Sequence, residues 1–188
     1  MIHFLVGPMG AGKNYVGELL AEKLNCKFID GDDFVPLETM KKIKSFKTLS
    51  KRDLNDFVKD HLIPKVEQQS NIHPDLVIAQ ALYRREHREI INKYFKGQCR
   101  FIKIKTPLMT NLKRLLTRKK GIRWALYGLI NRPFFQGDDV FEGMTINNGE
   151  SKRELMEDIN KVSAILNLID KGGEGLVEKL RKESIFYS

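Results

Sequence analysis

Short apolar runs alternate with longer segments of helical periodicity along this chain. Five runs are predicted to be buried strands, because they are short, apolar and bounded by glycine or polar residues: residues 2–6, 27–30, 76–79, 101–104 and 144–147. Helical spacing of apolar residues marks the segments between them: residues 13–25, 36–69, 84–95, 108–119 and 151–169. This alternation predicts a three-layer α/β fold, with a five-stranded parallel sheet and helices on both of its faces.

Local signals refine several of these helices. Pro64 should kink or end a helix within residues 36–69, because proline lacks the amide hydrogen that the helix uses. Ser151 followed by Glu154 has the spacing of a capping box, which predicts the start of the last helix. The predicted buried stripe of helix 108–119 consists of leucines: Leu108, Leu112, Leu115 and Leu116.

Residues 120–143 lack clean periodicity and contain Gly121, Gly128, Pro133 and Gly137. This composition predicts a mobile loop. A second glycine-rich break lies at residues 172–175, and it sets off a C-terminal tail, residues 171–188. The pattern shows no internal repeat and no domain boundary, so a single domain over residues 1–188 is expected.

Composition limits the class of protein. Apolar residues make up 41% of the chain and charged residues 30%, which is usual for a globular domain, and no apolar run is long enough to span a membrane. The opening has no basic leader, so no signal peptide is expected. Cys26 and Cys99 are isolated in sequence, which favours reduced thiols and a cytoplasmic protein.

The formal net charge of +9 suggests an anionic partner, such as a nucleotide, a phosphorylated metabolite or a nucleic acid. The basic residues gather in two clusters, residues 41–52 and 113–123. No recognised nucleic-acid motif or stacking platform accompanies them, so nucleic acid is not the expected partner.

A glycine-rich loop between the first predicted strand and helix carries the clearest functional signal. It fits the GxxxxGK core of a phosphate-binding loop: Gly7, Pro8, Met9, Gly10, Ala11, Gly12 and Lys13. The glycines allow the backbone amides to approach phosphates, and the start of the helix, with Asn14 and Tyr15, adds partial positive charge. Lys13 should reach the β- and γ-phosphates, so we expect this loop to bind ATP.

Asn14 departs from the usual loop, where a serine or threonine places its hydroxyl on Mg²⁺. An amide oxygen also suits a hard cation, so Asn14 remains a candidate metal ligand. The change leaves three alternatives open: Mg²⁺ is held differently, catalysis is weak, or the protein binds nucleotide without turning it over.

Carboxylates follow the second predicted strand, at Asp30, Asp32 and Asp33. Ligands of open parallel sheets bind beyond the carboxyl ends of strands. We therefore expect Asp30 to help hold Mg²⁺ and Asp32 to accept a proton from a substrate hydroxyl, whereas Asp33 could simply cap the next helix.

The sequence resembles two related families of small-metabolite kinases. Residues 4–13, 16–24 and 132–135 are similar to the shikimate kinase family, and residues 30–34, 77–91, 101–105 and 114–121 resemble the gluconate kinase family. The resemblance implies a P-loop kinase fold with a lid over about residues 118–137. It also implies that Arg118 and Arg132 neutralise charge on the transferred phosphoryl group, and that Asn147 lies against the adenine.

The acceptor-binding positions depart from both patterns. Val35 stands where the gluconate kinase pattern has histidine, and Gln80 where it has serine. Ala79, Gln80 and Ala81 replace the triple glycine of shikimate kinases. The sequence thus favours an ATP- and Mg²⁺-dependent kinase acting on a hydroxyl of a small polar metabolite, gluconate-like first. Alternatives are a shikimate kinase, a nucleoside monophosphate kinase, or a nucleotide-binding module with little catalysis, and either a monomer or a homodimer is compatible with the sequence.

Overall fold

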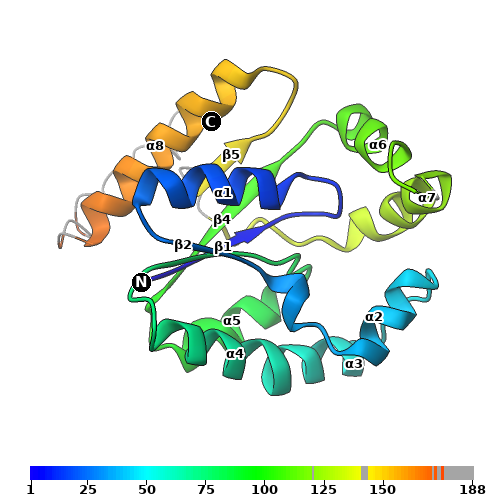
Figure 1. Ribbon diagram of the computed structural model, residues 1–188, viewed down its shortest axis with the longest axis horizontal. Helices are drawn as coiled ribbons and strands as arrows, with labels where there is room; N and C mark the ends of the chain where they lie inside the picture. The colour runs from blue at the N-terminus through cyan, green and yellow to red at the C-terminus, as the bar shows by residue number, and fades with distance from the viewer. Residues whose placement is uncertain (120, 141–143, 171, 173–174, 176–188) are drawn as a thin grey trace.

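A five-stranded, all-parallel sheet forms the centre of the computed structural model, which describes residues 1–119, 121–140, 144–170, 172 and 175 (Figure 1). The strands are β1 (Ile2–Val6), β2 (Lys27–Asp30), β3 (Leu76–Ala79), β4 (Cys99–Lys105) and β5 (Thr145–Asn147). Their order across the sheet is β2-β3-β1-β4-β5, with every adjacent pair parallel. The predicted fold class is confirmed.

Burial follows strand position. All five residues of β1 are buried, because this strand is central in the sheet and covered on both faces. Helices α1 (Lys13–Leu24) and α8 (Lys152–Asp170) cover one face, and α4 (Ile63–Ser70) and α5 (Arg85–Tyr94) cover the other (Figure 1). One of the two hydrogen bonds of the predicted capping box is present: the Ser151 hydroxyl accepts a hydrogen bond from the Glu154 amide at 3.2 Å.

A wide helical turn lies immediately before Pro64. Helix α3 (Lys51–Asp56) continues into a π-helical turn, η2 (Phe57–Leu62), and then into α4. Proline cannot donate a helical hydrogen bond and crowds the preceding turn, which a wider turn relieves. The predicted break is therefore present as a π-helical turn that buries Phe57 and Val58 against the core.

The prediction of a loop over residues 120–143 was wrong for much of that segment. Residues 121–131 form helix α7 (Gly121–Asn131), followed by a 3₁₀ turn, η3 (Arg132–Phe134). Ala125 and Gly128 pack inward, and a side chain on Gly128 would come within 2.6 Å of the Leu115 side chain on α6 (Leu108–Leu116). Ile122 and Leu126 face solvent. The apolar residues of α7 are therefore spread around the whole helix and form no single stripe.

Helix α6 (Leu108–Leu116) is shorter than predicted and turned differently. Leu115 is buried, but Leu108 and Leu116 are 43% and 52% exposed, so the predicted stripe was wrong for these two leucines. The buried face carries Thr110 and Asn111 instead. This buried face lies against the phosphate loop, where Asn111 forms a hydrogen bond with Met9.

Two short elements complete the chain on the side of β2. The 3₁₀ turn η1 (Gly31–Phe34) follows β2, and α2 (Leu37–Lys44) leads toward α3. Helices α2 and α3 lie at the same end of the molecule as α6 and α7 (Figure 1). Most of the predicted tail, residues 171 and 173–174 and 176–188, falls outside the described residues. Among the helices that the structure describes, none is long and apolar enough to cross a membrane.

Candidate functional site

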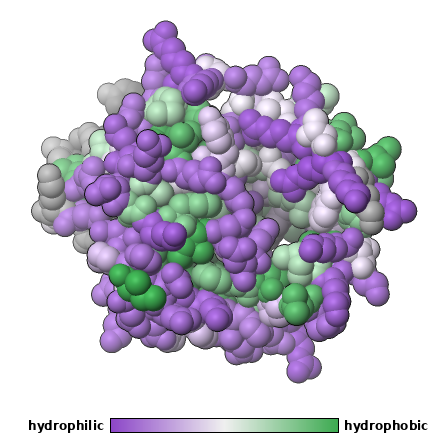
Figure 2. Space-filling view, in the orientation of Figure 1, coloured by the Kyte–Doolittle hydropathy of each residue, from purple (hydrophilic) through white to green (hydrophobic). Residues whose placement is uncertain are grey.

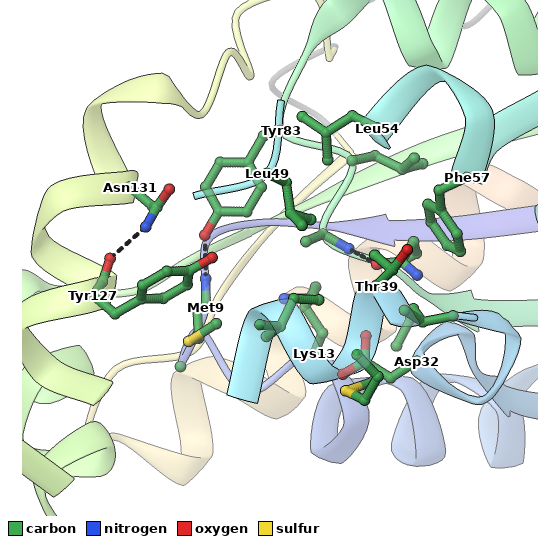
Figure 3. A pocket seen from close by; sticks show the side chains of 18 of the residues that line it. Met9, Lys13, Asp32, Thr39, Leu49, Leu54, Phe57, Tyr83, Tyr127 and Asn131 are labelled. Atoms are coloured by element: carbon green, nitrogen blue, oxygen red, sulfur yellow. Dashed lines mark hydrogen bonds between the residues drawn. The ribbon is translucent and has the colours of Figure 1, made fainter. Parts of the chain in front are cut away.

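A cavity of about 690 Å³ opens between the phosphate loop, η1, the end of β3, helices α2 and α3, and helix α7. Lys13, Asn14, Asp30, Asp32 and Arg118 all line it, so the structure brings together predicted residues from three parts of the chain. Figure 2 shows this face of the molecule hollowed, with hydrophilic residues around the hollow. Figure 3 shows Lys13 and Asp32 on one side of the cavity, apart from Leu49, Leu54 and Phe57.

The phosphate loop has the backbone conformation that its glycines predict. Gly10 and Gly12 have φ angles of 80° and 83°, in the left-handed region where glycine is favoured. A side chain on Gly12 would come within 2.2 Å of the Asn148 amide nitrogen. Gly12, the residue before α1, has no side chain that could cap the helix, which leaves its first amides available to an anion.

Side chains outside the loop hold its carbonyl groups. Asn148 and Thr106 donate hydrogen bonds to the Ala11 carbonyl at 2.8 Å and 3.0 Å. Asn111 donates to the Met9 carbonyl at 2.8 Å. These three residues were not predicted, although Thr106 and Asn148 are polar residues that directly follow strands. These hydrogen bonds from neighbouring segments hold the loop carbonyls, and so the loop backbone, in place.

Two further residues brace the same loop. The Tyr83 hydroxyl accepts a hydrogen bond from the Met9 amide at 3.0 Å (Figure 3). Arg114 donates to the carbonyls of Asn148 at 3.2 Å and Gly149 at 3.0 Å, and so joins α6 to the segment after β5. Neither residue was predicted, because each contact joins segments far apart in sequence.

Lys13 lies folded back on its own loop. Its ammonium group donates to the carbonyls of Gly7 at 3.1 Å and Pro8 at 3.2 Å. The pKa of Lys13 is lowered to about 8, mainly by burial; Asp32 opposes this shift, and the positive charge of Arg118 adds to it. A bound polyphosphate would stabilise the charged form of this lysine.

The acidic residues form a linked group at the end of β2. Asp30 accepts a hydrogen bond from the Asp32 amide at 3.0 Å and another from the side-chain amide of Asn14. Burial raises the pKa of Asp32, and the neighbouring Asp30 carboxylate raises it further. A carboxylate with a raised pKa is better suited to accept a proton than an ordinary surface aspartate.

This oxygen-rich group fits Mg²⁺ only in part. Within the described residues, no cluster of three or more histidine, cysteine or acidic side chains could enclose a metal. Mg²⁺ commonly keeps several waters and is held by one or two carboxylates together with substrate phosphates. Asp30 and Asn14 fit such an arrangement by their chemistry, because a carboxylate and an amide both carry oxygen atoms and both residues line the cavity beside the phosphate loop.

The other predicted residues lie in different surroundings. Of the described residues predicted for catalysis, Arg132 alone does not line the cavity. It donates to the Thr106 carbonyl at 2.9 Å, and its second terminal nitrogen is buried with no partner among the described residues. Asn147 donates through its backbone and side chain to Asp158, both at 2.8 Å. The side chain that reaches the phosphate loop is that of the next residue, Asn148.

A buried arginine joins the cavity wall to the segment after α7. Arg88 donates to the Leu82 carbonyl at 2.5 Å and pairs with Asp139 at 2.5 Å. Leu82 lines the cavity with a φ of 34°, an uncommon conformation for a residue other than glycine. Arg88 therefore helps to hold this wall in place, a role that the sequence did not predict.

The amino-acid sequence that forms this site matches a known protein family. The family model described as shikimate kinase matches residues 9–167, which is most of the chain. The chain belongs to the shikimate kinase family. The match covers the phosphate loop from Met9 onward, the acidic group and α7.

Curated relatives of this chain align with parts of it. A shikimate kinase of Persephonella marina is 44% identical over 64 residues, which cover 29% of this chain and 39% of that protein. A probable gluconokinase of Xenopus tropicalis is 33% identical over 92 residues, which cover 48% of this chain and 47% of that protein. The chain thus spans less than half the length of each of these relatives.

Solved structures share the fold more completely. A gluconokinase from Sinorhizobium meliloti superposes with a TM-score of 0.65 at 18% identity, covering 88% of this chain and 95% of that one. A shikimate kinase from Acinetobacter baumannii in complex with shikimate gives a TM-score of 0.52 at 19% identity, covering 88% and 93%. At these identities the likeness establishes the fold.

Proposed function

We propose that this chain is an ATP-dependent kinase that phosphorylates a hydroxyl group of a small molecule. The observation that carries the proposal is that Lys13 and Asp32 line one cavity beside a phosphate loop. Lys13 is suited to neutralise a polyphosphate, and Asp32 is suited to receive a proton, so one site holds groups for both substrates. Membership of the shikimate kinase family supports the same reaction class.

Each residue has a distinct role in this proposal. The loop amides and Lys13 bind the phosphates, Asp32 orients the acceptor hydroxyl, and Arg118 and Arg132 offset charge on the phosphoryl group in transfer. ATP supplies that phosphoryl group. The acceptor oxygen forms a bond to the γ-phosphorus, the bond to the β,γ-bridging oxygen breaks, and ADP leaves. The hydroxyl proton passes to Asp32 and then to solvent.

Asp30 and Asn14 are the residues that would hold Mg²⁺ through water and the phosphates. The ion would neutralise phosphate charge. Asn147 remains our proposed contact for the adenine, although its side chain is bonded to Asp158.

The second substrate of the proposed reaction is the hydroxyl compound that accepts the phosphoryl group. The sequence resemblance favours a gluconate-like hydroxyl compound, with shikimate and nucleoside monophosphates as alternatives. Val35 and Gln80, which replace the expected histidine and serine, both line the cavity. Their replacement leaves the identity of the acceptor open.

ADP release measured by a coupled assay, over a panel of hydroxyl compounds, tests the proposal. We expect ADP release to depend on one acceptor class and to reach about 1–100 s⁻¹. A phosphorus NMR spectrum should then show a new phosphomonoester. A protein that binds ATP but releases no ADP above the acceptor-free rate, across the panel, would contradict the proposal.

A second candidate is a nucleotide-binding module with little catalysis. The bond between the Asn14 amide and Asp30 favours it, because a serine hydroxyl would leave that carboxylate freer for a metal. Asn14→Ser is the decisive variant: under this candidate it creates turnover that the native protein lacks. Ordinary kinase rates in the native protein exclude it.

A further inference from the structure

The walls of the cavity away from the phosphate loop are mainly apolar. Leu49, Leu54 and Phe57 lie apart from Lys13 across the cavity (Figure 3). Val35, Ile43 and Leu82 line it as well. A compound with a hydroxyl on most of its carbons would have to leave water and face these side chains without hydrogen-bond partners, which is unfavourable.

Aromatic side chains form a further part of this wall. Trp124 and Tyr127 on α7 line the cavity, and Phe46, two residues after the end of α2, packs against both of them. The ring centroids of Phe46 and Trp124 are 4.7 Å apart in an edge-to-face arrangement. Phe46 has a φ of 59°, a conformation that L-residues rarely adopt, so the chain holds this ring in place at a conformational cost. Such a wall suits a ring or hydrocarbon body.

Several polar groups of the walls have protein partners. His87 is hydrogen-bonded to Asn55 at 2.9 Å, and Asn131 donates to the Tyr127 carbonyl at 2.7 Å. The Tyr83 hydroxyl is occupied by the Met9 amide. The Asn131 amide and the His87 ring nitrogen are thus engaged within the protein, whereas the Tyr83 hydroxyl can still donate.

Gln80 has a buried donor without a partner in the described part of the chain. Its side chain is 5% exposed and lines the cavity, and its oxygen accepts a hydrogen bond from the Ala81 amide at 2.7 Å. Its nitrogen is buried and has no partner among the described residues. A buried donor without a partner is unfavourable in the free protein, and an oxygen atom of a ligand would satisfy it. A side chain on Gly31 would lie 3.0 Å from this nitrogen, so the donor is beside the acidic turn that carries Asp32.

From this lining we infer that the acceptor is an alcohol with an apolar, ring-containing body and few hydroxyl groups, whose reactive hydroxyl lies at Asp32 and whose second oxygen is bound by Gln80. The inference rests on the proposed kinase function. It departs from the gluconate-like and shikimate-like acceptors, because it assigns most of the binding free energy to apolar contacts. Lys44 and Arg84 also line the cavity, so the class includes ring alcohols with or without an acidic group.

The experiment compares two sets of acceptors on the full chain. One set holds ring alcohols, such as benzyl alcohol, 2-phenylethanol and hydroxymethylbenzoate, and the other holds gluconate, shikimate and glycerol. Thermal stabilisation with a non-hydrolysable ATP analogue reports binding, and phosphorus NMR with ATP reports transfer. We expect binding and phosphomonoester formation with the first set only.

The outcomes separate this inference from the proposed function. Turnover of gluconate or shikimate, with the ring alcohols inert, overturns the inference and leaves the kinase proposal intact. Ring alcohols that bind without any transfer support the inference and count against the kinase proposal. A nucleotide-bound protein that is stabilised by no ring alcohol overturns the inference.

Trp124→Ala adds a matched test within one helix. It should raise the acceptor KM roughly tenfold, equivalent to losing a modest apolar contact, and change the KM for ATP less than twofold. Leu126→Ala, on the exposed face of α7, should change neither constant. Equal effects of the two variants, or a Trp124→Ala effect confined to ATP, would contradict the inferred position of the acceptor.

Discussion

The side-chain amide of Asn148 donates a 2.8 Å hydrogen bond to the Ala11 carbonyl, at the point where Gly12 leaves no room for a side chain. The strand at the far edge of the sheet thus fixes the phosphate loop that follows the central strand. We expect Asn148→Ala to weaken nucleotide binding and to lower the free energy of unfolding by about 0.5–1.5 kcal/mol, because the Ala11 carbonyl loses one donor and keeps the Thr106 hydroxyl.

Calorimetry with a non-hydrolysable ATP analogue and urea unfolding measure the two effects. Asn92→Ala, at an exposed position of α5, is the matched control, and Asn147→Ala tests the proposed adenine contact. A larger loss of nucleotide affinity in Asn147→Ala than in Asn148→Ala would reverse the assignment and favour the proposed adenine contact.

Lys13 should make nucleotide binding depend on pH. Its pKa of about 8 in the free protein means that it loses its proton as the pH rises through 8, and phosphate binding requires the charged form. Affinity for the ATP analogue should therefore fall between pH 7 and pH 9. Lys13→Met should remove this dependence and lower kcat/KM by roughly 10²–10³-fold, whereas Lys59→Met, on the exposed side of η2, should behave as the native protein.

Asp32→Asn should separate binding from transfer. Loss of the proton acceptor should lower kcat by roughly 10²–10⁴-fold, with the nucleotide Kd changed little. The raised pKa of Asp32 also predicts that the native kcat falls on the acid side as this carboxylate becomes protonated. Asp33→Asn is the neighbouring control, and a similar loss of kcat in both variants would remove Asp32 from its assigned role.

Two buried histidines should make the fold sensitive to acid. Burial lowers the pKa of His3 and of His87 to about 4, from an ordinary value of 6.5. Between these values the unfolded chain binds more protons than the folded one, so the free energy of unfolding falls as the pH drops from about 6.5 to 4. His87→Gln should reduce this fall, as measured by urea unfolding at pH 7 and 4.5. The exposed His61→Gln should leave it unchanged, and equal slopes in all three proteins would rule out a contribution from His87.

The buried pair between Arg88 and Asp139 should contribute far more than its exposed neighbour. Arg88→Met leaves a carboxylate without its partner and should lower the free energy of unfolding by about 3–5 kcal/mol. Arg85→Met breaks an exposed pair with Glu89 and should cost less than about 1 kcal/mol. Thermal and urea unfolding compare them, and similar losses would mean that Asp139 is stabilised by other groups.

The parts of the site that the sequence predicted are local. The strand, glycines and lysine of residues 2–13 are adjacent in the chain, and their spacing alone specifies a phosphate loop. The supporting contacts could not be found this way, because Tyr83 and Asn148 reach the loop across separations of 74 and 137 residues. Helix α7 was missed for another reason, since its apolar residues face both the core and the surface and so give no helical stripe.

The position of β1 at the centre of the sheet has a consequence for how such proteins diversify. The phosphate-binding groups follow β1, within the most constrained part of the core, whereas the apolar and aromatic walls come from α2, α3, η2 and α7 at the periphery. Substitutions in these peripheral helices can alter the acceptor while the phosphate loop keeps its support. A family built in this way can acquire new substrates by small evolutionary steps, each of which preserves a folded nucleotide-binding protein.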